Sequence, residues 1–336
     1  MSGIEDVARA LGVSTATVSR SIRGLPGVSE KTRRRVMATV DELGYVPSSS
    51  ASGLATGRTR TIGVLEPFVN RWFFAKAIEG ADKQLQAHGY NLMLFNLGGQ
   101  GSDRSRLFNK AMVQKQIDAL LVLCMALNPE ELEHMRDIDL PMVVVGGFAE
   151  HCPYIGIDDY AAASVAVNHL VDLGHQRIAF LHGQDEREFN FTVARARGQA
   201  FEDVMVRHDL EIRPEWDETG DYTMQSGWKA FERLWARPGE KPTAIFCTSD
   251  EMAMGVMFAA ARAGILVPGQ LSVIGMDNHE FAEALGLSTV EQRPEVQGEM
   301  ATKMVLAELA GHTGSIKTVI APHRLLARST TAPPGL

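Results

Sequence analysis

Apolar residues recur at helical spacing in the first 25 residues, in two short stripes separated by a glycine. The first stripe is Val7, Ala8 and Leu11, and the second is Val18 and Ile22. This spacing predicts two short helices. Gly12 lies at the bend between them, where a residue without Cβ tolerates positive φ, and Ser14 is a favoured N-cap for the second helix. The segment therefore predicts a helix-turn-helix pair.

The outward positions of the second predicted helix are small and polar, with a single arginine. They are Thr15, Ala16, Thr17, Ser19 and Arg20. Small hydroxyls and one guanidinium make a poor core, but they suit a helix that reads base edges in the major groove of DNA. An ordinary helical hairpin is the alternative explanation, because helix-turn-helix segments have look-alikes.

A third helical pattern and a linker-like run follow. Ser29 is placed to cap this helix, and Gly44 is placed to end it. Its apolar face consists of Val36, Val40 and Leu43. Residues 48–57 are rich in Ser, Ala and Gly, a composition typical of a linker.

From residue 61 onward, short apolar runs alternate with amphipathic helical patterns. Strands are predicted at 61–65, 91–97, 118–124, 141–146, 177–181, 243–248 and 271–276. Helices are predicted at 74–88, 103–116, 160–173 and 251–263. This alternation predicts parallel sheets covered by helices on both faces, the doubly wound α/β arrangement. There are more strands than one such sheet needs, so two α/β subdomains are expected.

Charge is unevenly distributed along the 336 residues, which suffice for two or three domains. The chain carries 33 Lys and Arg against 41 Asp and Glu, for a net charge of −8. Residues 1–60 hold nine of the basic and five of the acidic residues, so the positive charge is concentrated there. A basic N-terminal segment on an acidic body fits one nucleic-acid-binding surface.

The three cysteines, Cys124, Cys152 and Cys247, are widely spaced and form no CxxC pair or zinc-ligand pattern. Cys124 and Cys247 lie in strand-like apolar runs, so both are expected to be buried thiols. The sequence shows no secretory leader pattern and no apolar run of membrane length. A reduced, cytoplasmic protein without membrane contact is expected.

The sequence contains no recognisable catalytic motif. The run Gly98–Gly101 lacks the following Lys and Ser or Thr of a phosphate-binding loop, and no Gly-x-Ser-x-Gly elbow occurs. His169 and His175 are not spaced for one helical face, and His175 is expected in the turn after a helix. The acidic pairs Asp158–Asp159 and Asp185–Glu186 lie in loop-like contexts and are expected to be solvated. We predict no enzyme activity, no metal site and no cofactor.

The N-terminal segment resembles the LacI/GalR family of bacterial transcriptional regulators. The matching residues are Asp6, Val7, Ala8, Gly12, Val13, Ser14, Thr17, Val18, Ser19, Arg20, Val28, Ser29, Thr32, Arg33, Leu43, Gly44, Tyr45, Pro47, Ala51 and Leu54. The resemblance implies a helix-turn-helix DNA-binding domain at 1–47 and a hinge helix with linker at 48–60. Ala51 and Leu54 of this hinge are expected to contact DNA, with Leu54 wedged between base pairs in the minor groove. A flexible linker with an incidental leucine is the alternative.

The rest of the chain resembles the effector-binding core of the same family, which is similar to periplasmic sugar-binding proteins. Matching residues include His169, Leu170, Gly174, His175, Pro242, Thr243, Ser249, Asp250, Ala253, Gly255, Ile274, Gly275, Met276, Asp277 and Asn278. The resemblance implies a periplasmic-binding-protein-like core at 61–331 and a tail at 332–336. It divides the core into a first subdomain at about 61–160 plus 292–319 and a second at about 161–291 plus 320–331.

Side-chain chemistry then suggests which residues of the N-terminal domain contact DNA. Arg20 is the best donor for a bidentate contact with guanine, while Thr15 and Ala16 can touch thymine methyl groups. Arg23 is expected to contact a phosphate or a flanking base. Phosphate contacts, which set register without reading sequence, are expected from Ser14, Thr17, Ser19, Ser29 and Thr32.

A ligand is expected in the cleft between the two subdomains, at the carboxyl ends of strands. Asp277 follows a predicted strand, with an N-cap or turn role as the alternative. Arg197, expected to open a helix, matches the effector-binding arginine of the family, and Arg195 is close enough to take its place. Phe74 matches an aromatic cleft residue, with core packing as the alternative. Weaker assignments are Tyr222, Ser249 and Gln292.

The resemblance implies a sequence-specific DNA-binding transcriptional repressor controlled allosterically by a sugar or related metabolite. Effector binding would change the angle between the subdomains and thereby DNA affinity. A two-fold dimer would need a palindromic operator. The tail after Ser329 has no leucine heptads, so a homodimer is expected instead of a tetramer. Alternatives are a regulator of the same fold controlled by a protein partner and, more remotely, a sugar-binding transport protein.

Overall fold

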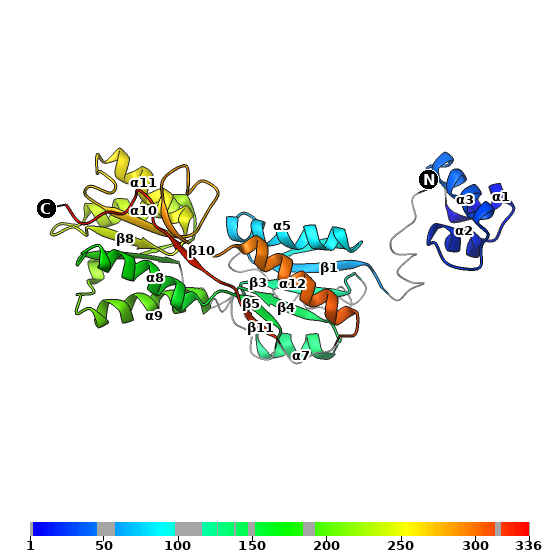
Figure 1. Cartoon of the computed structure of the whole chain (residues 1–336), viewed down its shortest axis with the longest axis horizontal. Helices are drawn as coiled ribbons and strands as arrows, with labels where there is room; N and C mark the ends of the chain where they lie inside the picture. The colour runs from blue at the N-terminus through cyan, green and yellow to red at the C-terminus, as the bar shows by residue number, and fades with distance from the viewer. Residues whose placement is uncertain are drawn as a thin grey trace. The chain divides into compact units, whose positions relative to one another are not determined.

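The computed structural model of the chain describes residues 3–45, 58–97, 116–125, 127–137, 139–146, 152–183, 192–312 and 317–335. The chain divides into two compact units, residues 1–60 and 61–336 (Figure 1). Several predictions fall outside the described residues: the hinge with Ala51 and Leu54, the helix at 103–116 apart from its last residue, and the acidic pair Asp185–Glu186.

Three helices form the described part of the first unit: α1 (Ile4–Leu11), α2 (Thr15–Ile22) and α3 (Glu30–Glu42). Gly12 follows α1 with φ 67°, as the sequence predicts for the bend. Ser14 and Ser29 cap α2 and α3, because each hydroxyl oxygen accepts a hydrogen bond from the backbone N–H three residues on. The predicted apolar stripes meet in one small core, whose buried members are Val7, Ala8, Val18, Val36 and Val40.

The first of two six-stranded sheets in the second unit is parallel at every described pair, in the order β11-β5-β4-β3-β1-β2. Its strands are β1 (Thr61–Glu66), β2 (Asn91–Asn96), β3 (Ala119–Leu123), β4 (Met142–Val145), β5 (Tyr154–Gly156) and β11 (Thr318–Ile320). The helices described in this subdomain are α5 (Trp72–Ala87), α7 (Pro129–Asp137) and α12 (Pro294–Leu309). The buried runs of β3 and β4 explain why these strands read as continuous apolar stretches.

Two glycines allow α5 and α12 to cross in close contact. A Cβ atom at Gly80 would lie 2.0 Å from the carbonyl oxygen of Glu295, and one at Gly298 would lie 1.9 Å from that of Ala77. Any side chain at either position would push the helices apart. The last helix of the chain, α12, is thereby packed onto the first helix of the same subdomain.

The second sheet has the order β12-β10-β9-β8-β6-β7, with β12 antiparallel to β10 and the other pairs parallel. Its strands are β6 (Ile178–Gly183), β7 (Asp217–Gly220), β8 (Ala244–Cys247), β9 (Ser272–Asp277), β10 (Ser288–Glu291) and β12 (Arg324–Leu326). One core forms against α8 (Asp159–Asp172) and α9 (Thr192–Arg207), and the other against α10 (Met224–Ala236) and α11 (Asp250–Arg262). Helices thus cover both faces, as predicted for a doubly wound sheet.

The chain crosses between the two subdomains three times: after β5, after β10 and after β11 (Figure 1). Helix α8, which packs on the second sheet, begins at Asp159, and β11 of the first sheet ends at Ile320. These crossings lie close to the boundaries expected at 160 and 319. The cleft between the subdomains is therefore spanned by three connecting segments of chain.

The C-terminal segment is tied into the second subdomain. The Thr330 hydroxyl donates to the carbonyl of Val273 at 2.7 Å. His175 lies in the turn after α8, as predicted, with Nδ1 2.9 Å from the Thr243 hydroxyl and Nε2 2.9 Å from the Ala332 carbonyl. Free, buried thiols at Cys124 and Cys247 are confirmed. No helix in the described part of the chain has both the length and the apolar character to cross a membrane.

Candidate functional site

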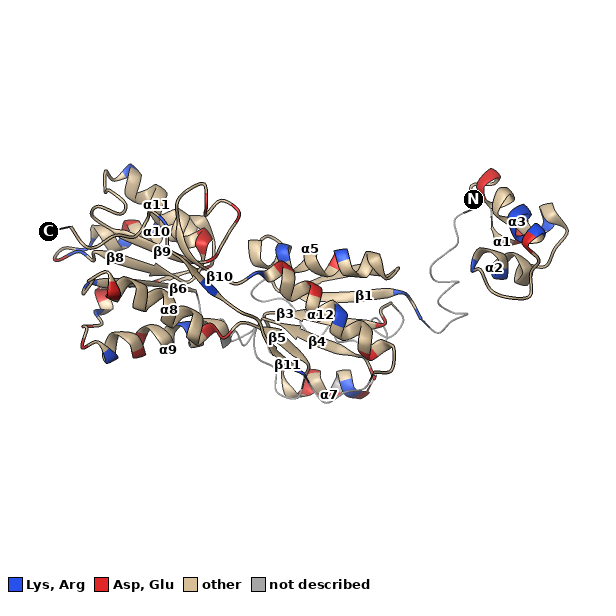
Figure 2. Ribbon diagram, viewed as in Figure 1, with Lys and Arg blue, Asp and Glu red and all other residues tan. Residues whose placement is uncertain are grey.

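The predicted reading face of α2 points away from the core of the first unit. Thr15, Ala16 and Arg20 are exposed, while Val18 and Ser21 on the opposite side are buried. No salt bridge joins Arg20 to an acidic side chain among the described residues, so its guanidinium is available to a ligand. Figure 2 shows that further Lys and Arg positions of this unit lie on α3.

Paired hydroxyls mark the N-termini of α2 and α3. The Ser14 and Thr17 hydroxyl oxygens lie 2.9 Å apart, and those of Ser29 and Thr32 also lie 2.9 Å apart. Within each pair one hydroxyl donates to the other, which leaves one hydroxyl proton free to donate elsewhere. With the positive end of each helix dipole, these pairs form two sites suited to phosphate oxygens.

Two other arginines of this unit bond carbonyls at the end of α2 and in the loop after it. Arg33 donates from Nη2 to the Leu25 carbonyl at 2.9 Å and from Nη1 to the Ser21 carbonyl at 3.4 Å. Arg23 donates from Nε to the Ser19 carbonyl at 3.2 Å, which leaves its Nη groups for a phosphate or base. The sequence identifies Arg33 as a basic residue that matches the family, but it does not show these two hydrogen bonds.

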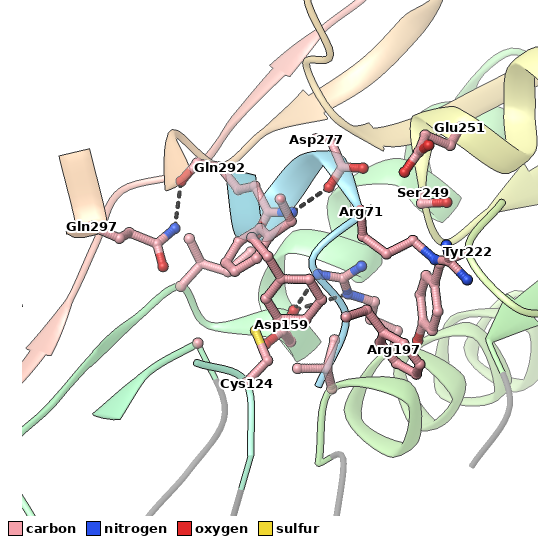
Figure 3. Close-up of a pocket in the computed structure, with 16 residues that line it drawn as sticks. Arg71, Cys124, Asp159, Arg197, Tyr222, Ser249, Glu251, Asp277, Gln292 and Gln297 are labelled. Atoms are coloured by element: carbon pink, nitrogen blue, oxygen red, sulfur yellow. Dashed lines mark hydrogen bonds and ion pairs between the residues drawn. The ribbon is translucent and has the colours of Figure 1, made fainter. Parts of the chain in front are cut away.

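All six residues expected to face a ligand line a single pocket in the second unit (Figure 3). The six are Phe74, Arg197, Tyr222, Ser249, Asp277 and Gln292. Further lining residues that sequence reasoning did not select include Phe68, Arg71, Cys124, Asp159, Glu251 and Gln297. The pocket draws residues from both subdomains, with α5 and α12 on one side and α9 and α11 on the other.

A buried ion pair forms the floor of the pocket. Arg197 donates from Nε to Asp159 Oδ1 at 2.9 Å, places Nη2 2.7 Å from the same oxygen, and donates from Nη1 to the Thr248 carbonyl at 2.6 Å. Burial raises the pKa of Asp159, and the Arg197 charge acts against this shift. Two-point contact of this kind fixes the guanidinium plane.

Two sequence-based expectations are wrong here. The Asp159 side chain is only 12% exposed instead of solvated, because Arg197 from α9 reaches it. Asp158 is exposed, and it caps α8 by accepting from the Ala161 N–H at 2.9 Å. Arg197 does not open a helix, since α9 begins at Thr192 and places it in the second turn. The choice between the neighbouring arginines is also resolved by position: Arg197 lines the pocket, whereas Arg195 lines a separate hollow beside β6 and β7.

Asp277 ends β9 with φ 135°, in a conformation that L-residues rarely adopt. Its carboxylate accepts from the Gln292 side-chain amide and, at 3.3 Å, from the Asp250 N–H. Asp250 lies directly behind, fully buried, and accepts from the Thr289 hydroxyl and the His279 N–H. Burial raises the pKa of Asp250 to about 7, and burial together with Asp250 raises the pKa of Asp277 well above its ordinary range. Both carboxyl groups therefore keep their protons to higher pH than exposed aspartates do.

Aromatic rings supply the apolar surface of the pocket. Phe74 is buried, with its ring 5.7 Å from Phe73 and 6.5 Å from Phe68, so it both packs and lines the cavity. Tyr222 sits on the turn after β7 with φ 61°, and its ring lies over Gly183, where a Cβ atom would be 2.0 Å away. Burial raises the pKa of Tyr222 to about 12, so it is a neutral hydroxyl.

Two polar side chains complete the lining. Ser249 caps α11 by accepting from the Met252 N–H at 3.3 Å. Gln297 donates from Nε2 to the Gln292 carbonyl at 2.6 Å, and a carbonyl can only accept, so the amide orientation is fixed. This leaves Gln297 Oε1 buried without a donor among the described residues. The described residues contain no group of three or more His, Cys, Asp or Glu arranged to hold a metal ion.

Two family models match the chain: one described as bacterial regulatory proteins, lacI family, over residues 3–48, and one described as a periplasmic binding protein-like domain over residues 167–331. The chain is 33% identical to catabolite control protein A of Priestia megaterium over 332 residues, which cover 98% of each protein. It is 34% identical to the HTH-type transcriptional repressor PurR of Serratia proteamaculans over 338 residues, which cover 99% of this chain and 97% of that one. Among solved structures, the transcriptional regulator CelR–cellobiose complex matches with a TM-score of 0.71 at 26% identity, covering 98% of this chain and 100% of that one.

Proposed function

Because the chain belongs to the lacI family of bacterial regulatory proteins and is a DNA-binding transcription regulator, we propose that it is a repressor that binds a palindromic operator as a homodimer. We further propose that an uncharged sugar or sugar derivative controls it from the cleft pocket. The observation that carries this proposal is the pocket, which joins aromatic rings to carboxylate and amide groups from both subdomains.

On the DNA side, the proposal assigns base contacts to the exposed residues of α2. Arg20 would donate to guanine, and Thr15 and Ala16 would contact thymine methyl groups. The hydroxyl pairs at the starts of α2 and α3 would bind phosphates and set register. A single helix-turn-helix domain binds DNA weakly, so two copies bound to the two halves of a palindrome are expected to be needed for tight binding.

On the ligand side, the chemistry of the pocket favours hydroxyl groups on an apolar frame. Phe74 and Tyr222 would pack against the C–H face of a sugar, and Asp277 would accept its hydroxyls. Arg197 already has the Asp159 carboxylate as its counter-charge, so the pocket favours an uncharged ligand over a phosphorylated one. The related CelR structure is a complex with cellobiose, which supports a sugar as the chemical class.

A DNA-binding experiment tests whether the chain recognises a palindromic operator through Arg20. A pool of random palindromic duplexes is bound by the full chain at two salt concentrations, with Arg20→Ala and Arg9→Ala alongside. Arg9 is exposed on α1 and paired with Asp6, which makes it the matched control. A symmetric enriched sequence that Arg20→Ala loses and Arg9→Ala keeps supports the proposal; absence of any enriched sequence would count against it.

Ligand control is tested by thermal stabilisation with neutral sugars, sugar acids and sugar phosphates, followed by the effect of each hit on operator binding. Asp277→Asn is expected to abolish stabilisation by a neutral sugar. Control by a protein partner is the alternative that the same experiment tests. A pocket without affinity for any compound in the panel would favour that candidate. A sugar-binding transport role would require ligand binding without any operator.

A further inference from the structure

The first turn of α5 contacts the second subdomain at the mouth of the pocket. The Trp72 backbone N–H donates to Glu251 Oε2 at 3.4 Å, and Arg71 Nε donates to the Asp221 carbonyl at 3.3 Å. Glu251 belongs to α11, and Asp221 follows β7. Both contacts therefore cross the cleft from the first subdomain to the second.

The side chain of Trp72 makes further contacts across the same gap. Its ring centroid lies 5.0 Å from that of His279, with 33° between the planes. Its indole N–H donates to Glu280 Oε2 at 3.1 Å, and Lys76 Nζ lies 3.5 Å from the same oxygen. His279 and Glu280 follow β9, so these contacts also join the two subdomains. We call the set of contacts made by Arg71, Trp72 and Lys76 with the second subdomain the α5 bridge.

Trp72 stands beside the pocket without lining it. Its neighbours Arg71, Phe73 and Phe74 do line the pocket, whereas Trp72 lines a different hollow together with Lys76, Asp277 and Glu280. A change to the Trp72 side chain therefore removes no atom from the lining of the pocket, although Asp277 borders both hollows. Its main effect is expected on the relative position of the two subdomains, which the Trp72 side chain joins.

We propose that Trp72 is a positioning residue that holds the two subdomains closed at the mouth of the pocket. Ligand entry and release then require the α5 bridge to break. The inference deepens the proposed function, since it assigns to Trp72 the control of access to the proposed effector site. Each contact of the bridge is modest because it is partly solvated, so opening is infrequent but accessible at ordinary temperature.

Cys124 provides a probe of opening that needs neither ligand nor DNA. It lines the pocket and is 9% exposed, whereas Cys247 is fully buried in the second sheet and Cys152 is 6% exposed elsewhere in the first subdomain. The rate of alkylation of each thiol by N-ethylmaleimide is measured on the full chain by mass spectrometry. A rise at Cys124 alone reports opening of the cleft, while Cys247 and Cys152 report loosening of the subdomains themselves.

Three variants make the test specific to the bridge. Trp72→Ala removes the ring contact and the indole donor but keeps the backbone N–H. Trp72→Phe keeps an aromatic ring for His279 and removes the donor to Glu280. Trp228→Ala is the matched control, because the Trp228 indole also donates to a glutamate, Glu232 at 2.7 Å, but within helix α10.

The expected result is that Trp72→Ala raises the Cys124 rate about tenfold, equivalent to about 1.4 kcal/mol in the opening equilibrium. Trp72→Phe should give an intermediate rise, and Trp228→Ala none, with Cys247 and Cys152 unchanged throughout. An unchanged Cys124 rate in Trp72→Ala, or an equal rise at Cys247, overturns the proposal. The Cys124 measurement needs no ligand, so failure to find a sugar ligand would not change its outcome. The proposed sugar effector and the proposed role of Trp72 can therefore be refuted independently.

Discussion

Glu66 ends β1 in a fully buried position, and neither of its carboxylate oxygens has a hydrogen-bond partner among the described residues. Burial raises its pKa to about 7, from about 4.5 in the unfolded chain. Between these pH values the unfolded state releases a proton that the folded state keeps. The free energy of unfolding therefore falls as pH rises through this range, by about 1.4 kcal/mol per pH unit and about 3 kcal/mol in total.

The assay is urea unfolding of the full chain at pH 5 and pH 8, with the wild type compared to Glu66→Gln and Glu66→Leu. Neither variant can ionise at this position, so each should lose about 2–3 kcal/mol less than the wild type between the two pH values. Glu66→Leu should also be the more stable protein at pH 8, because it removes a buried charge without a partner. The reasoning is refuted if the stability difference between variant and wild type is the same at both pH values.

Three further predictions concern Arg20, Asp159 and His175. Arg20→Ala should weaken operator binding by about 1–3 kcal/mol in fluorescence anisotropy, and an equal loss on random DNA would contradict a base contact. Asp159→Asn leaves the Arg197 guanidinium buried without a counter-charge and should lower the free energy of unfolding in urea by about 3–5 kcal/mol; a loss below about 1 kcal/mol would contradict a dry ion pair. His175→Ala frees the Ala332 carbonyl, so limited proteolysis should cleave the C-terminal segment faster, and an unchanged rate would show that His175 does not hold it.

The helix-turn-helix unit was predictable because its determinants are local. The stripe around Val7, the positive φ at Gly12 and the cap at Ser14 each lie within a few residues of what they control. The parallel strands were predictable for a related reason: a strand buried on both faces must be apolar throughout, and β3 and β4 are. Strand order was not predicted, because no local pattern determines it, and only the resemblance to a known family suggested the crossings between subdomains.

The pocket was predictable in location and only partly in chemistry. The structure brings all six expected residues together, while their contact with a ligand stays a prediction. Asp159 was missed because its environment is set by Arg197, which is 38 residues away in the sequence. Gln297 was missed because nothing local marks it: its side chain is oriented by the carbonyl of Gln292. Charged and amide groups in a cleft are defined by partners that only tertiary structure supplies.

The three crossings between the subdomains also bear on how such a protein can be rebuilt by recombination. One exchange point between residues 45 and 61 would transfer the DNA-reading unit whole, with its own small core. Neither α/β subdomain of the second unit can be transferred by one exchange, because each is assembled from separate stretches of chain. A contiguous piece that ended after β10 would lack β12, its antiparallel neighbour, and would leave that edge unpaired. One exchange therefore joins a given operator specificity to a different complete pocket, whereas the two sides of a single pocket cannot be exchanged separately in one step.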